Sequence, residues 1–542
     1  MKMAGKMLLQ ALLLLLFLFV LGIPCFSLPL SINGRWIVDA KTGQRVKLAC
    51  GNWPSHVEIM LAEGLDKQPL QYIIAQLRQH HFNCVRFTWA THMFTRYANR
   101  TVMESLDSFN LTDAKAGIAK NNPFVLKLTL VQAFEAVIDH FGAQGVMVVL
   151  DNQVSRPTWC CGYDDGNGFF GDADFDADEW LQGLAMVAGR FKGKSQVIGI
   201  STRNELRGPL ANEDDWYKYI YQGGATIHKA NPDVLIFASG LAYASDLTFL
   251  KKKHLQTNFD NKLLYEAHWY AFSWGEGKVW GMEFVNKACQ SKTQYFINQT
   301  GFVVNGDNPF PMFVGEFGLD QRGLSRADEH FYACFLAYAA DEDLDWGVWA
   351  WQGSYYYREN KTGTEETYGV MDFNWNRVRN KEFQNRMQLI KSKLQDPSSR
   401  ISTSFIMFHP LSGSCINTED RKGIYATGCK APSHWIHEGD RTPIRLRGTK
   451  LCLKAVGDGL EPILSEDCSS KQSSWTSLSE SKLHLAAIDE NGEYLCLQKE
   501  SRYTTRILTS SCVFIHEEPE CQKDPQKDPV TQWFKLVKTN VL

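Results

Sequence analysis

Residues 197–205 read Val-Ile-Gly-Ile-Ser-Thr-Arg-Asn-Glu, a short apolar run that ends on an amide and a carboxylate. Seven other runs of this kind, rich in β-branched and aromatic residues, are separated by stretches long enough to hold helices. The eight runs are Arg45–Trp53, Cys84–Ala90, Val146–Gln153, Val197–Glu205, Leu235–Gly240, Leu263–Tyr270, Met312–Gly318 and Trp346–Gln352. Near-continuous apolar strands that alternate with helix-length segments predict a parallel sheet covered by helices.

Eight such units in roughly 300 residues match a closed (β/α)8 barrel, the TIM barrel, and an open doubly wound sheet is the alternative. The polar and aromatic residues at the C-terminal ends of the runs favour the barrel, because all these ends meet at one mouth, where barrel enzymes keep their active sites. These residues are Arg86, Asp151, Asn152, Asn204, Glu205, His268, Tyr270, Glu316 and Trp351.

The barrel pattern ends after a helix-like stretch at Lys381–Leu394. Three cysteine pairs then recur at spacings of 14, 16 and 16 residues, each pair followed by a tryptophan. The pairs are Cys415 with Cys429, Cys452 with Cys468, and Cys496 with Cys512, and the tryptophans are Trp435, Trp475 and Trp533. The repetition predicts a threefold all-β domain, and each pair would close a repeat-sized loop as a disulfide. We place the barrel at 28–397, a polar linker at 398–403 and the all-β domain at 404–542.

The N-terminus predicts a secretory signal peptide over 1–27, because two lysines precede an apolar run at 7–23 and a small residue, Ser27, offers a cleavage site. An uncleaved anchor is the alternative, since 17 residues just reach the length of a membrane span. No other segment is apolar enough to span a bilayer. Four glycosylation sequons, at Asn99, Asn110, Asn298 and Asn360, are compatible with export.

Composition is that of an ordinary globular protein, with 44% hydrophobic and 22% charged residues. The formal net charge of -3 offers no basic surface, so we expect no nucleic-acid partner. Fourteen cysteines, of which only Cys25 precedes the predicted cleavage site, favour disulfides in an oxidising compartment. The thirteen that remain are an odd number, so at least one thiol is free or intermolecular.

Two strand ends supply carboxyl groups: Asn204-Glu205 after the fourth run and Gly315-Glu316 in the seventh. A single glutamate at such a place more often caps a helix or pairs with an arginine. Two of them at one mouth favour glycoside hydrolysis. That reaction needs one carboxyl to protonate the leaving group and one to attack the sugar or to activate water.

Residues 30 to 395 resemble glycoside hydrolase family 5. The resemblance rests on Asn204-Glu205, Gly315-Glu316, His268-x-Tyr270 and Trp351. The resemblance implies a retaining β-glycosidase with Glu205 as acid/base and Glu316 as nucleophile. It also implies substrate-binding roles for further residues, and it implies no metal or cofactor. Those roles are hydrogen bonds to the nucleophile from Arg86 and Tyr270, a contact of Asn204 with the sugar 2-hydroxyl, a lining position for His268, and Trp351 as the floor under the reacting sugar.

One position departs from the family pattern. Gln153 stands at the end of the third strand, where many members carry a histidine, and an amide can bond a sugar hydroxyl but cannot titrate.

The surroundings of the other predicted site residues lead to two further expectations. A nearby guanidinium and phenol are expected to favour the ionised form of Glu316. Three more tryptophans near the predicted strand ends either stack on sugar or pack the barrel core, and the sequence leaves both open. These are Trp269, Trp274 and Trp349.

An acidic stretch at 164–179 carries aspartates at 172, 174, 176 and 178. A calcium site is conceivable, but the spacing lacks the glycine and final glutamate of an EF-hand loop, so we predict a solvated loop that starts the next helix. Cys160 and Cys161, just after the third strand, are expected to be disulfide partners rather than metal ligands.

The C-terminal repeats resemble the ricin-type lectin β-trefoil over about 402 to 540. The Gln-x-Trp signature of that family reads Ser433-His434-Trp435, Ser473-Ser474-Trp475 and Thr531-Gln532-Trp533, and keeps only the tryptophan. The aspartate expected to grip sugar is replaced by Asn417, Lys454 and Gln498. The residues that pack a core survive and those that bind ligand do not, which favours a structural module over a working lectin.

We therefore expect a secreted enzyme that hydrolyses or transfers β-linked glycosyl units, with a carbohydrate substrate as its partner. The alternative is a catalytically weak carbohydrate-binding protein on a barrel scaffold. The presence of both Glu205 and Glu316 favours the enzyme, whereas Gln153 leaves room for the alternative. The arrangement most resembles plant members of the family with an appended trefoil, which implies the cell wall or apoplast as the location.

Overall fold

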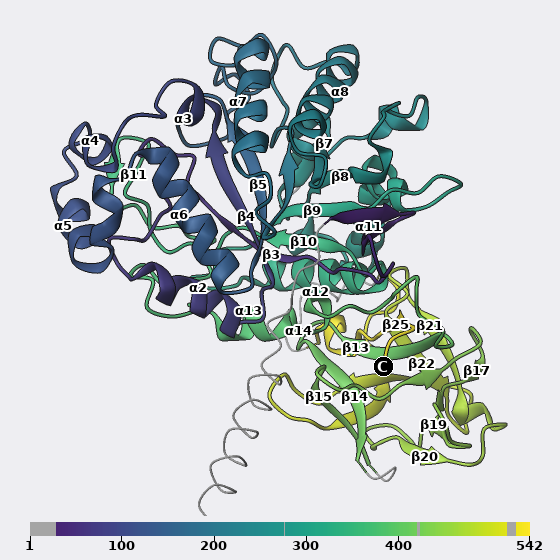
Figure 1. The fold of residues 1–542 in the computed structure, drawn as a ribbon. Helices are drawn as coiled ribbons and strands as arrows, with labels where there is room; N and C mark the ends of the chain where they lie inside the picture. The colour runs from purple at the N-terminus through teal and green to yellow at the C-terminus, as the bar shows by residue number, and fades with distance from the viewer. Residues whose placement is uncertain (1–28, 276, 420–422, 518–526) are drawn as a thin grey trace, which may run out of the picture.

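The computed structural model describes residues 29–542 except 276, 420–422 and 518–526 (Figure 1). The predicted signal peptide and Cys521 lie outside the described residues. Within the described part of the chain, no helix combines the length and the apolar character needed to cross a membrane. A short hairpin, β1 (Leu30–Asn33) and β2 (Trp36–Asp39), precedes the main fold.

Eight parallel strands close into a barrel in the order in which they occur along the chain. The last strand pairs with the first, with Trp346 opposite Ala49, so the predicted barrel is confirmed and the open sheet is wrong. The strands are β3 (Ala49–Trp53), β4 (Cys84–Ala90), β5 (Met147–Val154), β6 (Val197–Ser201), β7 (Leu235–Ser239), β8 (Leu263–His268), β9 (Met312–Phe317) and β10 (Asp345–Val348).

Helices lie around the outside of the barrel (Figure 1). In α6, for example, Thr129 and Gln132 form a capping box, and Leu130, Phe134 and Phe141 follow at helical spacing on the buried face. The helices of this part are α2 (Leu70–Gln79), α3 (Thr91–Thr95), α4 (Val102–Asp107), α5 (Thr112–Asn121), α6 (Leu130–Ala143), α7 (Ala177–Arg190), α8 (Glu213–Ala230), α9 (Leu241–Ala244), α10 (Val279–Met282), α11 (Val285–Gln299), α12 (Arg326–Asp341), α13 (Lys381–Arg386) and α14 (Gln388–Lys391).

Alternate residues of the strands fill the inside of the barrel. Met147 and Val149 belong to the cluster inside the barrel, whereas Val148 between them packs into the larger cluster shared with the helices. Cys50 and Cys84 face each other on neighbouring strands and form a disulfide. The interior is therefore a packed apolar plug, and above it, toward the C-terminal ends of the strands, polar residues point into the barrel.

The second domain is all-β, as predicted, and its strands form antiparallel sheets of a β-trefoil-like domain. The three predicted disulfides, Cys415–Cys429, Cys452–Cys468 and Cys496–Cys512, are confirmed. The strands are β13 (Ser404–His409), β14 (Ser414–Glu419), β15 (Gly423–Gly428), β16 (Trp435–Ile436), β17 (Thr442–Pro443), β18 (Arg445–Leu446), β19 (Cys452–Lys454), β20 (Ile463–Ser465), β21 (Ser474–Leu478), β22 (His484–Ile488), β23 (Tyr494–Lys499), β24 (Ile507–Ser511) and β25 (Lys535–Thr539).

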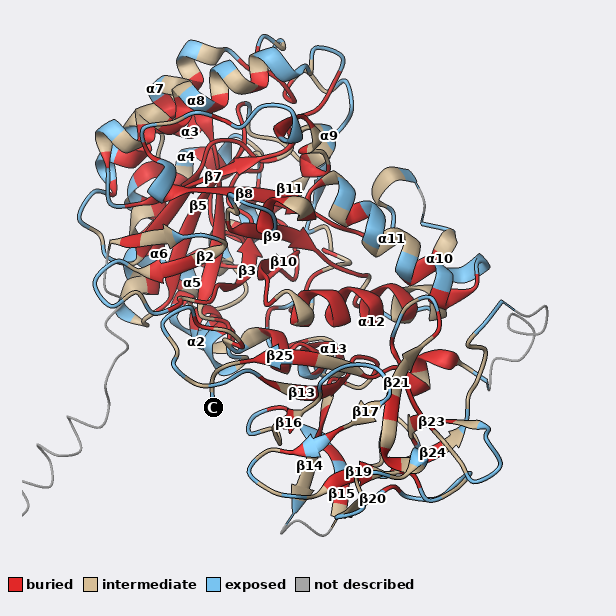
Figure 2. Cartoon of the chain, turned by 90° about the vertical axis from the view of Figure 1, so that its right-hand side faces the viewer, coloured by how far each residue is buried: buried red, intermediate tan, exposed pale blue. Residues whose placement is uncertain are grey.

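Helix α12 lies between the two domains (Figure 2). Every residue from His330 to Ala340 is buried, as expected of a helix with the barrel on one side and β25 on the other. The indole nitrogen of Trp533 donates to Asn286 of α11 at 2.9 Å, and Asp528 accepts from His330 at 3.1 Å. These contacts join the second domain firmly to the side of the barrel.

Candidate active site

A layer of buried polar side chains closes the barrel above its apolar interior. Arg86 stands two residues beyond the inward-facing Cys84, Asp151 two beyond Val149 and Glu266 two beyond Leu264, so strand periodicity turns all three toward the barrel axis. The Arg86 guanidinium lies 2.9 Å from the Asp151 carboxylate, 2.8 Å from Glu266 and 3.1 Å from Glu316. One guanidinium therefore holds three carboxylates together at the base of the site.

The charges of this layer depend on one another. Burial opposes the charge of Arg86, but its carboxylate neighbours outweigh burial and raise its pKa. Burial raises the pKa of Asp151 to about 7 in spite of Arg86. For Glu266 the balance is reversed, since Arg86 and His268 overcome the effect of burial and lower its pKa. Glu266 is thus the carboxylate that the layer keeps most firmly ionised.

Glu316 lies in β9, next to Gly315. A β-carbon at position 315 would lie 1.9 Å from a carboxylate oxygen of Glu266, so only glycine fits there. Tyr270 donates to Oε2 of Glu316 at 2.9 Å, and Arg86 donates to Oε1 at 3.1 Å. The two hydrogen-bonding neighbours expected from the sequence are therefore in place and fix the carboxylate.

The electrostatics of Glu316 differ from the expectation that a guanidinium and a phenol would favour its ionised form. Burial raises the pKa of Glu316 by more than His268 and Arg86 lower it. The carboxylate is almost completely buried at the barrel mouth, and desolvation disfavours its charge more strongly than the nearby cations favour it. The basic neighbours thus only limit the rise in its pKa.

Glu205 follows the end of β6 by four residues, and its side chain is partly buried. His268 contacts it through Nδ1, which lies 2.8 Å from Oε1 of Glu205. The other ring nitrogen of His268 lies 3.3 Å from Glu266. Burial disfavours the imidazolium, but Glu316, Glu205 and Glu266 surround it and raise the pKa of His268 to about 10. His268 is therefore a cation at neutral pH.

Glu205, His268 and Glu316 each place one side-chain oxygen or nitrogen within 4.8 Å of those of the other two. Such a group has the spacing of a metal site. However, both ring nitrogens of His268 already contact carboxylates, Nδ1 that of Glu205 at 2.8 Å and Nε2 that of Glu266 at 3.3 Å. The chemistry that this arrangement supports best is carboxylate chemistry, with two glutamates facing each other.

A cavity of about 900 Å³ opens above the two glutamates. Gln153, His268 and Tyr270 line it, as expected, and Gln153 is within weak hydrogen-bonding range of Glu316 at 3.5 Å. The remaining wall combines polar and charged residues with apolar and aromatic ones. These wall residues include Trp159, Cys160, Cys161, Tyr243, Phe272, Trp274, Trp349 and Tyr368.

Trp351 does not form the floor of this cavity. Its side chain is completely buried and its ring packs against Phe82 at 5.4 Å between centroids. Strand β10 already ends at Val348, and the backbone nitrogen of Trp351 donates to the carbonyl of Asn52, which directs the residue into the core. Trp349 lines the cavity in its place. Trp269 is also a core residue, whereas Trp274 lies in the cavity wall.

Asn204 is also not placed for the contact with the sugar 2-hydroxyl that the family resemblance implied. It is completely buried, its Oδ1 accepts from Arg86 at 2.7 Å, and its Nδ2 lies 3.8 Å from the sulfur atoms of both Cys160 and Cys161. These two cysteines form a disulfide with each other, which confirms that they are disulfide partners. The disulfide covers the amide of Asn204 and so keeps it from lining the cavity.

The wall also contains a second histidine, which no sequence motif indicated. His56 follows β3 by three residues and lines the cavity. Its Nδ1 lies 2.7 Å from Oγ1 of Thr88, and its buried Nε2 contacts no other polar atom of the described residues. Burial lowers the pKa of His56 to about 3, so the ring is neutral. The only available signal was its position just after the first strand.

The acidic stretch at 164–179 forms a loop that leads into a helix, as predicted. Asp176 accepts from the backbone of Glu179 and caps α7, and Asp172 accepts two backbone N–H groups of its own loop. Asp174 pairs with Arg156 at 2.6 Å. Three of the four aspartates thus bind protein groups.

Comparison with known proteins identifies the family. Residues 44–354 match the family described as cellulase (glycosyl hydrolase family 5). The chain is also 40% identical over 548 aligned residues to a glycosyl hydrolase 5 family protein from Chamaecyparis obtusa, with 98% of this chain and 96% of the relative covered. The chain belongs to glycosyl hydrolase family 5. It is therefore a glycoside hydrolase, and the matched residues contain β3 to β10 and both glutamates.

More distant similarities are found to an endoglucanase sequence and to solved structures with the same fold. An endoglucanase from Paenibacillus polymyxa is 22% identical over 59% of this chain and 78% of its own length. The catalytic domain of the major endoglucanase from Xanthomonas campestris has a TM-score of 0.54 at 22% identity and covers 67% of this chain and 98% of that one. The hyperthermophilic endocellulase from Pyrococcus horikoshii also has a TM-score of 0.54, at 18% identity, covering 68% and 99%.

Proposed function

We propose that the protein is a retaining β-glycosidase in which Glu316 is the nucleophile and Glu205 the acid/base. The distance between these two carboxyl groups supports the proposal, because oxygens of Glu205 and Glu316 approach within 4.8 Å. Retaining enzymes place their carboxyls about 5 Å apart, whereas inverting enzymes need roughly 6.5 Å or more to admit a water between them. The gap here leaves room for direct attack on the anomeric carbon.

In the first step Glu316 attacks the anomeric carbon while Glu205 donates its proton to the leaving oxygen. Arg86 and Tyr270 hold the attacking carboxylate through their hydrogen bonds. In the second step Glu205 takes a proton from water, which then displaces Glu316 and releases the sugar with its original configuration. The imidazolium of His268 lies beside both carboxyls and stabilises whichever one is ionised.

The substrate that we propose is a β-linked polysaccharide or glycoconjugate. Gln153 and the free nitrogen of His56 are placed to bond sugar hydroxyls, and Trp349 rather than Trp351 offers an aromatic surface in the cavity. The Pyrococcus endocellulase has been crystallised with cellotetraose, and two relatives of this chain are named endoglucanases. β-Glucans are therefore the first substrates to test.

We propose that the enzyme acts outside the cell, with the cell wall or apoplast as its location. Six disulfides among the described residues favour an oxidising compartment, and the 40% identical relative is from a plant. The predicted signal peptide provides the route. Detection of a mature protein that begins near residue 28 in the apoplastic fluid would test this.

For the second domain we propose a structural role. The three positions expected to bind sugar are engaged within the domain: Asn417 accepts from the backbone of Ser433, Lys454 pairs with Asp467, and Gln498 accepts from Gln532. None of them carries a free carboxylate. The domain instead packs against α11 and α12 and keeps the side of the barrel covered.

One experiment tests both activity and stereochemistry. The full-length protein is incubated with β-linked glucans, mannans, xyloglucans and aryl β-glycosides, and early products of any cleaved substrate are followed by proton NMR. We expect the β-anomer to appear first and to mutarotate afterwards. An inverted first product contradicts the retaining mechanism. Binding without turnover across the panel instead supports a carbohydrate-binding protein, which the burial of Asn204 would help to explain.

A further inference from the structure

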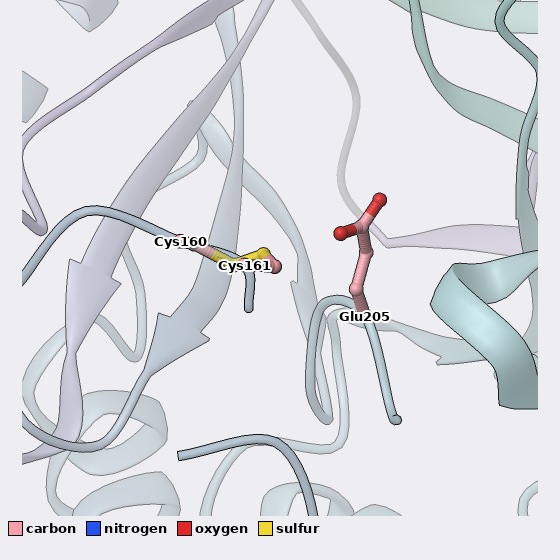
Figure 3. Close-up of side chains that lie close together, drawn as sticks. All are labelled: Cys160, Cys161 and Glu205. Atoms are coloured by element: carbon pink, nitrogen blue, oxygen red, sulfur yellow. A yellow bond between two sulfur atoms is a disulfide. The ribbon is translucent and has the colours of Figure 1, made fainter. Parts of the chain in front are cut away.

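The Cys160–Cys161 disulfide lies in the wall of the cavity directly beside Glu205 (Figure 3). One carboxylate oxygen of Glu205 and both sulfur atoms lie within 4.8 Å of one another. Cys161 is the more exposed of the two cysteines, because only 8% of the surface of Cys160 is exposed. A disulfide between neighbouring residues thus borders the carboxyl that we assign to the acid/base.

Polar contacts also hold the loop that carries this disulfide. Arg207 donates to the carbonyl of Gly162 at 2.8 Å and forms an ion pair with Asp165, which itself accepts from the backbone of Gly162. Asn167 fixes the start of the loop by bonding the backbone of Ser155 at 2.8 Å. The segment is therefore anchored on both sides of the two cysteines by polar contacts.

The disulfide is chemically matched to the apolar face of a sugar. It has no hydrogen-bond donor, its sulfur atoms are polarisable, and it covers the amide of Asn204. Trp159 continues the apolar surface, with Trp349 at 6.1 Å between ring centroids. The guanidinium of Arg358 lies 3.4 Å over one face of the Trp159 ring, which leaves the other face for a sugar. The C–H groups of a pyranose pack favourably on such a wall.

We propose that the Cys160–Cys161 disulfide and Trp159 form a sugar-binding subsite that packs a pyranose ring of a β-linked glycan at the bond presented to Glu205. This inference rests on the proposed function. An acid must lie within hydrogen-bonding distance, about 3 Å, of the glycosidic oxygen, so a wall this close to Glu205 contacts one of the two rings that flank that oxygen. The two adjacent cysteines therefore contribute to substrate choice as well as to stability.

The test is a binding measurement in the Glu316→Gln background, which separates affinity from turnover. Calorimetry with cellotetraose, mannotetraose and xylotetraose first identifies the oligosaccharide that the parent binds most tightly. Adding Cys160→Ala/Cys161→Ala is expected to raise its Kd roughly tenfold, because one apolar ring contact is lost. Adding Cys160→Ala/Cys161→Met is expected to restore most of the affinity, since methionine supplies apolar sulfur without a cross-link.

A control removes another disulfide, Cys452–Cys468 of the second domain, by the same double alanine substitution, and we expect no change in Kd. Equal Kd values for the parent and the Cys160→Ala/Cys161→Ala variant overturn the subsite, as do a methionine variant that binds no better than the alanine variant and a parent that binds none of the three. If the alanine variant does not fold, Trp159→Ala in the parent replaces it, and an unchanged Kd again overturns the subsite.

The two proposals fail in different ways. A wild-type protein that binds these oligosaccharides but cleaves none of the glycans in the activity panel contradicts the proposed function alone. A wild-type protein that cleaves them, with cysteine variants that bind as the parent does, contradicts the subsite alone.

Discussion

Nδ1 of His268 lies 2.8 Å from Oε1 of Glu205, and this contact places a buried cation beside the acid/base. Three carboxylates, from Glu205, Glu266 and Glu316, face the imidazole and raise the pKa of His268 to about 10. Because this pKa is raised in the folded state, the stabilisation that it brings is complete below the ordinary histidine value, about 6.5. It is lost as the pH rises through about 10.

The first prediction concerns Glu266→Gln. Removing one carboxylate from the ring should lower the pKa of His268 by roughly one unit, so the alkaline loss of activity and of folding free energy should begin at lower pH. Urea unfolding and kcat/KM measured between pH 6 and 10.5 check this. The control is Asp151→Asn, which removes a carboxylate that contacts Arg86 but not His268. If both variants keep the wild-type alkaline limb, His268 is not held as a cation by Glu266.

Substitutions of the two proposed catalytic glutamates should impair activity in different ways. Glu316→Gln should abolish turnover of every substrate, because no carboxylate remains to attack the anomeric carbon. Glu205→Ala should spare aryl glycosides, whose good leaving groups need little protonation, and added azide should increase its rate by attacking the glycosyl-enzyme without base assistance. Steady-state rates with and without azide, and mass spectrometry of the azide product, check both.

Two outcomes would count against this assignment. Wild-type activity in the Glu316 variant would exclude it as the nucleophile. A Glu205 variant that is equally impaired on activated and unactivated substrates, and insensitive to azide, would exclude Glu205 as the acid/base.

The fold could be predicted because periodicity and strand-end chemistry report on the same architecture. The first run illustrates the limit: it begins at Arg45, but β3 begins only at Ala49. Arg45 and Lys47 are instead buried in ion pairs with Asp343, which is far from them along the chain. Composition of a run does not reveal a partner 298 residues away, so the true beginning of this strand could not be predicted.

The site was predictable where a side chain belongs to a strand and less so where it follows one. Glu316 and His268 lie in strands, and periodicity fixes their direction. Trp351 comes after β10 has ended, so periodicity no longer applied, and it turned into the core. Asn204 kept its position, but a disulfide between two adjacent cysteines covers it, and the sequence alone did not show which cysteines pair.

The different roles of Trp351 in the core and Trp349 in the cavity wall can be tested with two alanine variants. Trp351→Ala should lower the free energy of unfolding by about 3–5 kcal/mol, because it leaves a large hole in a fully buried part of the core. Trp349→Ala should cost less stability but raise KM for oligosaccharides roughly tenfold, since its ring lines the cavity. Chemical denaturation and steady-state kinetics on the two variants check this. A larger KM effect from Trp351 would restore it as the floor of the site.

The last prediction is that the second domain binds galactosides weakly or not at all. A lectin site of this type relies on a carboxylate that accepts hydrogen bonds from sugar hydroxyls, and such charge-assisted bonds are the strong ones. Here Asn417, Lys454 and Gln498 stand at those positions and their polar atoms bind neighbours within the domain. Sugar would have to displace these contacts as well as water, so its net gain is small. We expect Kd values for galactose and lactose above roughly 1 mM in calorimetry on the full-length protein.

The matched variant is Asn417→Asp, which keeps the oxygen that accepts from Ser433 and adds a carboxylate. Submillimolar binding of lactose by the wild type that survives Trp349→Ala, and therefore does not arise in the barrel, would contradict a structural role for the domain.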